Sequence, residues 1–321
     1  MDPQLQALAA QQGNVILRPQ LIEAGFTDDE IMRLRRSGVL TAIRRGAYVE
    51  TPVWEALDDV GRHRSMTSAV VRQLKVPAVP SHVSAAVMLG LPTWGVDLSV
   101  VHVTRADLHA ARLEAGVMHH AAALPGEDLC VVDGMTLTAP ARTAVDIARD
   151  VPFEQGVVTA DAALARFGND HDRLLRTLDR MRTWRGARAA GRVVAFADGA
   201  AESVGESRAR VQFERIGLPR PRLQVVIPGP DGQIFRPDFL FEEERTLGEF
   251  DGRSKYERSL GPDDDPASVV WREKQREDQL RQMGYELARL VWRDLGRDVS
   301  VRDRFQAAFG RARRRRAVRA A

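Results

Sequence analysis

Apolar residues recur at helical spacing in three short segments near the start of the chain. Residues 5–14 (LQALAAQQGN) and 18–25 (RPQLIEAG) predict two short helices, each ending at a glycine. A third helix is predicted over 28–37, because Thr27 followed three residues later by Glu30 is a capping box. The chain therefore begins with a small helical module.

Residues 39–50 (VLTAIRRGAYVE) place β-branched and aromatic residues around a glycine, which predicts a two-stranded ribbon. Three helices and a ribbon predict a winged helix-turn-helix domain over residues 1–52, with the helix over 28–37 as the recognition helix. Its first turn is acidic, so contacts with DNA must come from its basic half and from the wing. The candidate DNA-binding residues are Arg33, Arg35, Arg36, Arg44 and Arg45. The alternative is a module that binds only protein, with solvated arginines.

The following pattern mixes short strands and helices. Residues 81–92 predict a helix of small residues, 98–104 a strand, 116–150 strands leading into a helix, and 157–167 a further helix. This alternation predicts an α/β middle domain over residues 53–195.

The last third predicts another α/β domain, over residues 196–305. Its segments are a helix over 201–217, strand-like runs at 222–227, 234–241 and 246–252, and a long amphipathic helix over 267–294. In that final helix we expect Trp271 to be a core residue. Six arginines fall in residues 310–321, and residues 306–321 are predicted to be a disordered basic tail that adds salt-sensitive affinity for nucleic acid or only solubility.

Composition restricts the class of protein more than its function. Hydrophobic residues make up 44% and charged residues 28%, which is typical of a soluble globular protein and excludes a disordered or membrane protein. With the 321-residue length and the alternating elements, we expect an α/β multidomain protein. No apolar run is long enough to span a membrane, so we expect a cytoplasmic protein without membrane partners. Most cations are arginines, which suit phosphate recognition but also arise from codon usage. Cys130 is the only cysteine and is predicted to be a small buried residue.

The histidines are spread through the middle of the sequence. His119 and His120 are neighbours on a predicted strand and point to opposite sides, so they cannot chelate one ion directly. We therefore expect the histidines to be polar residues of the core or of an interface, rather than metal ligands. The seven are His63, His82, His102, His109, His119, His120 and His171.

An acidic constellation stands out in the last domain. Glu249 and Asp251 are two residues apart on a predicted strand, so they share a face, and the neighbouring strand can place Asp238 beside them. Three carboxylates on one face repel one another, and a divalent cation removes that cost. Hard oxygen ligands suit Mg²⁺ or Mn²⁺, which can activate water and neutralise charge on a phosphodiester. An acidic loop and edge strand that discourage edge pairing are the ordinary alternative.

Two family resemblances add to this pattern. The segments PSHVSAAVMLGLP, VVHVTRAD, LTAPARTAVDIA and GVLTAIRRGAYV resemble the AbiEi-type antitoxins, over roughly residues 1–180. The resemblance implies a transcriptional autorepressor of a type IV toxin-antitoxin system, with DNA and a cognate toxin or defence protein as partners.

The second resemblance covers residues 200–295. The segments ESVGESRAR, RPDF, GEFDGRSKY and WREKQREDQLRQMGYELARL resemble the Vsr-like branch of the PD-(D/E)-x-K nucleases, which have a restriction-endonuclease-like fold. The resemblance implies that Asp238 and Glu249 bind the metal and that Glu206 is the helix acid, with Glu202 as the other choice. Asp251 stands where the superfamily usually has lysine, and Lys255 stands where this branch commonly has histidine. Lysine there suits an electrostatic role better than that of a base.

The sequence therefore favours a DNA-binding protein with a metal-dependent endonuclease domain, in a toxin-antitoxin or foreign-DNA defence setting. The alternative is a non-enzymatic AbiEi-type antitoxin whose last domain only grips DNA or a partner protein. An RNA-directed nuclease or a nucleotidyltransferase partner stays open, because Mg²⁺ chemistry on phosphodiesters is alike across these substrates.

Overall fold

The chain folds into two compact units of mixed helix and sheet. The structure, a computed structural model, describes residues 3–230, 232–252 and 266–320. The first unit comprises Met1–Ala163 and Asp170–Ala195, and the second comprises Leu164–Asn169 and Phe196–Ala321. Among the helices of these described ranges, none has both the length and the hydropathy needed to cross a membrane.

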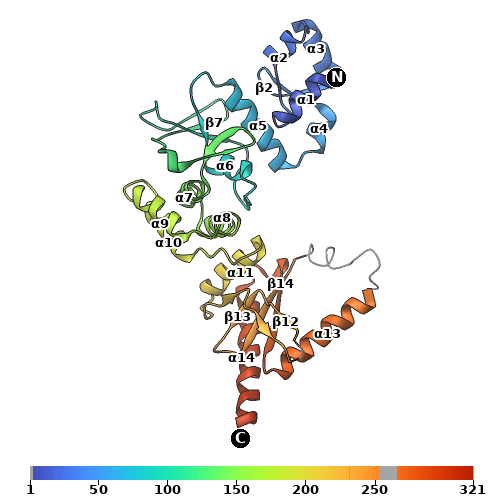
Figure 1. The fold of residues 1–321 in the computed structure, drawn as a ribbon, viewed down its shortest axis with the longest axis vertical. Helices are drawn as coiled ribbons and strands as arrows, with labels where there is room; N and C mark the ends of the chain where they lie inside the picture. The colour runs from blue at the N-terminus through green and yellow to red at the C-terminus, as the bar shows by residue number, and fades with distance from the viewer. Residues whose placement is uncertain (1–2, 231, 253–265, 321) are drawn as a thin grey trace. The chain divides into compact units, whose positions relative to one another are not determined.

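Residues 3–50 form helices around a small antiparallel sheet of order β1-β3-β2 (Figure 1). The elements are α1 (Pro3–Gln11), β1 (Ile16–Leu17), α2 (Arg18–Glu23), α3 (Asp28–Arg36), β2 (Leu40–Arg44) and β3 (Ala47–Glu50). The predicted capping box at α3 is confirmed, since the backbone N–H of Thr27 donates to Glu30 Oε2 over 2.8 Å. The sequence missed β1, which adds a third strand to the predicted ribbon by pairing Ile16 with Tyr48.

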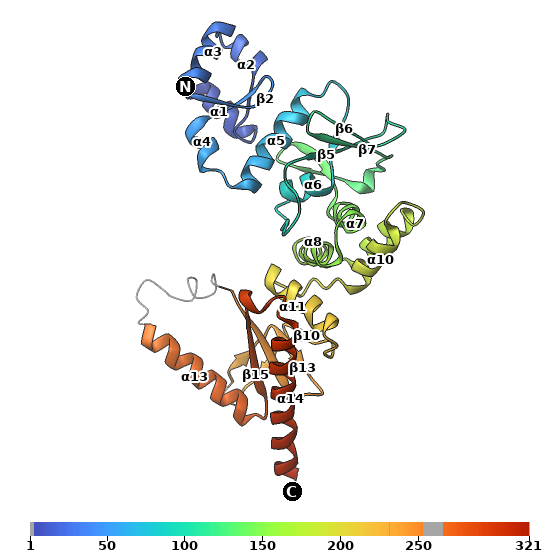
Figure 2. The same cartoon turned by 180° about the vertical axis from the view of Figure 1, so that it is seen from behind.

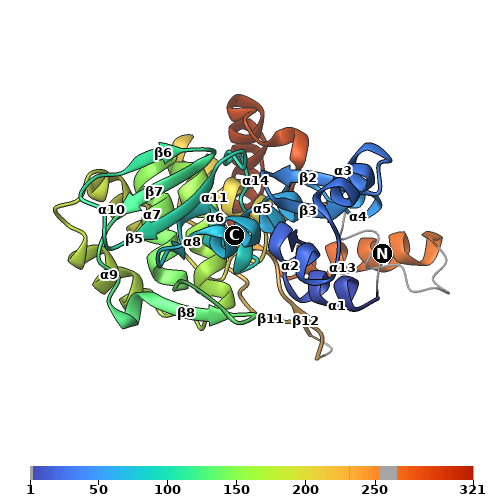
Figure 3. The ribbon, with the colours of Figure 1, turned by 90° about the horizontal axis from the view of Figure 1, so that it is seen from above.

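The rest of the first unit packs helices against a mixed sheet of order β4-β5-β7-β6, which Figure 3 shows from above. Strands β5 and β7 are parallel, and β8 and β9 form a separate hairpin. The elements are α4 (Thr51–Ala56), α5 (Asp59–Gln73), β4 (Val79–Pro80), α6 (His82–Met88), β5 (Val101–Arg105), β6 (Arg112–Glu114), β7 (Val117–Ala121), η1 (Gly126–Asp128), β8 (Leu129–Val132), β9 (Met135–Thr138), α7 (Pro140–Asp150), α8 (Phe153–Arg166), α9 (His171–Arg180) and α10 (Ala187–Phe196).

A buried charge network fixes α7 within this unit. Arg142 donates to Asp128 Oδ2 over 2.7 Å and to Asp146 Oδ2 over 2.8 Å, and all three side chains are buried. The guanidinium of Arg142 also lies over the ring of Trp184. Because a charge taken out of water is costly unless it is paired, this arrangement constrains how α7 packs against its neighbours.

The second unit is built on a sheet of order β10-β13-β14-β15, with β14 and β15 parallel. Its elements are α11 (Val204–Arg215), β10 (Arg222–Leu223), β11 (Ile227–Pro228), β12 (Ile234–Phe235), β13 (Phe239–Phe241), β14 (Thr246–Asp251), α13 (Pro266–Gln282), β15 (Glu286–Val291), η2 (Trp292–Asp294) and α14 (Asp298–Ala320). Phe213 of α11 and Phe305 of α14 pack on the sheet face that carries Phe239, whereas Leu280 of α13 packs with Leu240 on the other face. Figure 2 shows β15 between α13 and α14.

Two sequence predictions for this unit are corrected. The predicted helix over 267–294 is wrong beyond Gln282, because Gly284 takes a positive φ and residues 286–291 continue as β15 with alternating burial. The alternation of apolar residues in ELARLV is a strand pattern, which the long helix prediction absorbed. Trp271 is 60% exposed on α13, so it is not the core residue that was expected.

The end of the chain also differs from its prediction. Residues 306–320 are helical within α14, instead of forming a disordered tail. Phe309 and Ala312 are buried, and Arg313 pairs with Glu244. Arg311 and Arg315 both pair with the buried Glu286. Apolar burial and ion pairing along α14 therefore order a segment whose arginine content alone suggests disorder.

Candidate nucleic-acid interface and acidic cluster

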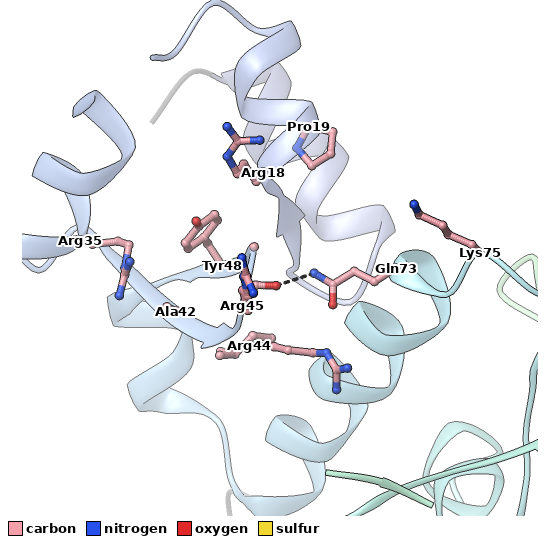
Figure 4. A pocket seen from close by; sticks show the side chains of 11 residues that line it. Arg18, Pro19, Arg35, Ala42, Arg44, Arg45, Tyr48, Gln73 and Lys75 are labelled. Atoms are coloured by element: carbon pink, nitrogen blue, oxygen red, sulfur yellow. Dashed lines mark hydrogen bonds between the residues drawn. The ribbon is translucent and has the colours of Figure 1, made fainter. Parts of the chain in front are cut away.

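Basic side chains of the first unit gather around one open hollow, which we call the basic hollow (Figure 4). They come from α2, from α3, from the end of β2 and the turn after it, and from the segment that follows α5. Tyr48 and Gln73 lie between them, and Gln73 Nε2 donates to the backbone oxygen of Arg45. The basic residues that line the hollow are Arg18, Arg35, Arg44, Arg45 and Lys75.

These cations differ in how far the protein already neutralises them. Arg18 donates two hydrogen bonds to Asp28, and this partner lowers the pKa of the Asp28 carboxyl. Arg44 donates to the backbone oxygen of Ala115 over 3.1 Å. Within the part of the chain that the structure describes, Arg35 and Arg45 make no ion pair. The hollow therefore carries uncompensated positive charge.

The candidate DNA-binding residues do not all fall in one place. Arg35, Arg44 and Arg45 line the basic hollow, and Arg36 lines an adjoining depression together with Arg35. Arg33 lines neither of these and lies 3.9 Å from Glu30. The sequence missed Arg18 and Lys75, because only the packing of α2 and α5 beside the ribbon brings them to the hollow.

In the second unit, the strand register places Asp238, Glu249 and Asp251 on the sheet face that α13 covers. Leu240 of β13 and Leu247 of β14 pack with Leu280 of α13, so they mark the face that this helix covers. Each of the three acids is an even number of residues from Leu240 or Leu247 on its own strand, and therefore points to the same face. Asp238 is 6% and Glu249 8% exposed.

A glutamine links the helix acid to Asp238. Gln224 Nε2 donates to Glu206 Oε2 over 3.2 Å and to Asp238 Oδ1 over 3.3 Å. Gln224 takes a φ of +51°, which breaks the predicted strand over 222–227 and is unusual for a residue other than glycine. Glu202 instead pairs with Arg236, so of the two candidate glutamates it is Glu206 that shares a hydrogen-bond donor with Asp238.

The close approach of α11 to β14 holds Glu206 in this place. A Cβ on Gly205 would lie 2.0 Å from Phe250 Cε1, so only glycine fits there. Glu206 is 1% exposed and also accepts from Ser203 Oγ as part of the cap of α11. The capping interaction with Ser203 explains part of the burial of Glu206. The hydrogen bond from Gln224 is not part of the helix cap.

Arginines compensate the remaining acids. Glu249 lies 2.8 Å from Arg276 of α13 and 3.7 Å from Arg289 of β15, and Arg289 also lies 3.7 Å from Asp251. Among the described residues, no three of the four predicted acids bring ligand oxygens within 4.8 Å of one another. Their oxygen chemistry suits Mg²⁺, but as placed they do not by themselves form a three-ligand site. Lys255 lies outside the described residues.

Three of the histidines form a cluster that the sequence did not indicate. His82, His102 and His120 lie together, with one ring nitrogen of each within 4.8 Å of the others. Burial lowers the pKa of His102 and of His120 to about 4. His119 is buried and stays out of the cluster, as the alternation along a strand predicts. Sequence spacing could not find the cluster, because the three residues come from separate elements.

Comparisons with known proteins find similarities for part of the chain. Residues 100–198 match the AbiEi antitoxin C-terminal domain family. Two Mycobacterium tuberculosis proteins, uncharacterized protein MT2308 (strain CDC 1551 / Oshkosh) and uncharacterized protein Rv2248 (strain ATCC 25618 / H37Rv), are each 34% identical over 173 residues. The match covers 54% of this chain and 61% of each relative.

A solved structure gives a weaker similarity. The crystal structure of the RV2827C protein from Mycobacterium tuberculosis aligns over 71% of this chain and 87% of that chain, with 19% identity and a TM-score of 0.40. The AbiEi match ends at residue 198, before the acidic cluster begins. These similarities give no support to the Vsr-like resemblance of the second unit, which stays a prediction.

Proposed function

We propose that the chain is a DNA-binding protein of a toxin-antitoxin or foreign-DNA defence system, and that the basic hollow is its DNA contact. The observation that carries the proposal is the convergence of Arg35, Arg45 and Lys75, from three separate segments, on one exposed surface. The AbiEi antitoxin domain at residues 100–198 supports the setting. A cognate toxin encoded nearby is the protein partner that this setting implies.

The chemistry of the hollow suits phosphate and base edges. Arginine donates two parallel hydrogen bonds from a planar fork, which matches phosphate oxygens and the edge of guanine. In the proposed complex the basic end of α3, with Arg35 and Arg36, enters the major groove, and the turn at Arg45 contacts the backbone as a wing. Arg18 neutralises Asp28 in the acidic first turn, which reduces the repulsion of DNA by this turn.

DNA binding by the full chain tests this proposal. Fluorescence anisotropy would compare the duplex upstream of the chain's own coding region with a shuffled duplex, over a series of salt concentrations. We expect preference for the upstream duplex and a log–log salt slope of about −0.9 for each phosphate neutralised. Equal, weak binding to both duplexes would contradict a regulator that reads sequence.

A second candidate activity is metal-dependent hydrolysis of DNA phosphodiesters by the second unit. Three observations favour it. The order helix, three antiparallel strands, helix and strand is present around the sheet. Asp238 and Glu249 share a buried face, and Gln224, in a strained backbone conformation, donates hydrogen bonds to both Glu206 and Asp238. In this candidate Asp238 and Glu249 would hold Mg²⁺ or Mn²⁺, which activates water and neutralises phosphate charge. Asp251, Lys255 and Glu206 would assist.

Cleavage of supercoiled, linear and mismatched DNA tests the second candidate. With Mg²⁺ or Mn²⁺ we expect nicking that a chelator abolishes and that Asp238→Asn/Glu249→Gln lowers by on the order of a hundredfold or more. Glu242→Gln is the matched control, because Glu242 is an exposed acid that follows the same strand. If the unaltered chain and both variants bind DNA equally and none of them cleaves it, the second candidate is contradicted and a non-enzymatic antitoxin and repressor is favoured. Cleavage of RNA alone would point to the RNA-directed alternative.

A further inference from the structure

Three imidazoles meet where α6 packs on the mixed sheet of the first unit. His82 is the first residue of α6, His102 lies on β5 and His120 lies on β7. In the parallel register His102 pairs with Met118, and Thr104 pairs with His120. His102 and His120 therefore lie diagonally on one face of the sheet, and α6 brings His82 onto the same face.

The nitrogen atoms lie at distances that one ion could bridge. His102 Nδ1 and His120 Nε2 are 3.0 Å apart, and the ring centroids of His82 and His120 are 3.7 Å apart. Zinc binds histidine nitrogen at about 2.0–2.1 Å, so two nitrogens of a tetrahedral site lie about 3.3 Å from each other. An ion would replace the hydrogen bond between His102 and His120, and the ring of His82, which is stacked on His120, would turn to bring its nitrogen to the same ion.

The backbone of His82 is in a strained conformation that the local sequence does not explain. His82 takes a φ of +50°, a left-handed conformation that is uncommon for side chains with a Cβ, while its side chain is buried. Such outliers persist where the surrounding structure requires them, and they gather at functional sites. Ser81 Oγ lies 3.0 Å from His82 Nδ1, so this hydrogen bond helps to hold the ring in place.

Both carboxylates and arginines lie near the cluster. Burial lowers the pKa of all three histidines, and the charges of Arg142 and Arg149 lower the pKa of His82 and His120 further. His82 Nε2 lies 3.5 Å from Asp150 Oδ2 and 3.9 Å from Asp146 Oδ1. A dication bound here would therefore have a carboxylate close by, as a further ligand or as an outer partner.

We propose that His82, His102 and His120 form a binding site for a divalent transition metal of the zinc class. Nitrogen donors select zinc and its neighbours over Mg²⁺, so the site differs in kind from the acidic cluster of the second unit. Three protein ligands leave a fourth position for Asp150 or water. The bound metal ties α6 to β5 and β7, within the part of the chain that matches the AbiEi domain and the helix just before it.

Zinc binding by the full chain tests the proposal. Chelator-stripped protein would be titrated with zinc by calorimetry, and with cobalt(II) to read the coordination from its visible absorption. We expect one equivalent of zinc per chain and the intense cobalt bands of a nitrogen-rich tetrahedral site. His102→Gln and His120→Gln should each lower the zinc affinity by on the order of a hundredfold, since even outer partners of a metal site are worth about 10–100-fold.

Two histidines provide matched controls. His119→Gln alters the neighbour of His120 on the opposite face of β7, and His109→Gln alters an exposed histidine between β5 and β6. Both variants should bind zinc as the unaltered chain does. Absence of stoichiometric zinc binding, binding unchanged in His102→Gln and His120→Gln, or equal loss in His119→Gln would overturn the proposal.

If the histidine variants fail to fold, zinc binding can still be tested on the unaltered chain. Diethyl pyrocarbonate modification of the unaltered chain, mapped by mass spectrometry, should show that zinc protects His102 and His120 and leaves His109 reactive. Equal modification of all three with and without zinc would also overturn the proposal.

Discussion

Replacing Arg35 and Arg45 together with alanine lowers the affinity for DNA by on the order of a hundredfold near physiological salt, at about tenfold for each arginine. Both side chains line the basic hollow, and neither has an ion-pair partner among the described residues, so no described acid competes with phosphate for them. The log–log salt slope should become less steep by about two, one for each lost phosphate contact. Anisotropy titrations at four or more salt concentrations measure both quantities.

A variant with the same loss of charge elsewhere controls for net charge. Arg182 and Arg188 are exposed in the same unit and do not line the hollow. Their double alanine variant should keep the affinity within about threefold and lower the salt slope little, because exposed charges beyond a Debye length of about 10 Å are largely screened. If this control loses as much affinity as Arg35→Ala/Arg45→Ala, the hollow is not the DNA contact.

Replacing Arg142 with methionine destabilises the first unit by about 3–5 kcal/mol. The substitution removes the cation between Asp128 and Asp146. Asp128 then keeps only its ion pair with Arg180, and Asp146 keeps only its ion pair with Arg149. It also removes the cationic group that lies over Trp184. Urea unfolding followed by far-UV circular dichroism gives the loss, and hydrogen exchange of α7 should localise it to this unit.

Two further variants make this prediction specific. Adding Asp146→Asn to Arg142→Met should recover part of the lost stability, since a buried carboxylate that has lost one of its two arginine partners is then gone. Arg222→Met breaks an exposed ion pair with Glu242 and should change stability by no more than about 1 kcal/mol. A small effect of Arg142→Met, or no recovery by Asp146→Asn, would mean that the network does not hold α7 in place.

Local signals in the sequence were sufficient for the N-terminal helices and for the start of the second unit. Thr27 and Glu30 cap α3 as predicted, and Ser203 caps α11 at the start of the predicted helix. Each of these signals depends on residues within one turn of helix. Local sequence signals gave the wrong prediction where tertiary packing determines the structure. The apolar residues of β15 fitted a helix as well as a strand, and the arginines of α14 suggested disorder until Glu244 and Glu286 supplied partners.

The sites were predictable only where their residues are close in sequence. Glu249 and Asp251 share a face because they are two apart on β14, as predicted. The arginines that compensate them, Arg276 and Arg289, come from later elements and were not expected there. The histidine cluster was missed for the same reason, since strand pairing and the packing of α6 create it. Long-range contacts of this kind leave no periodic pattern in the sequence.

Crosslinking of DNA to the full chain tests the central claim most directly. A duplex carrying 5-iodouracil would be irradiated with the protein, and the crosslinked peptides would be mapped by mass spectrometry. We predict crosslinks within residues 18–75, centred on α3 and on the turn between β2 and β3, and their loss in Arg35→Ala/Arg45→Ala. Crosslinks confined to the second unit, unchanged by these substitutions, would contradict DNA binding through the basic hollow.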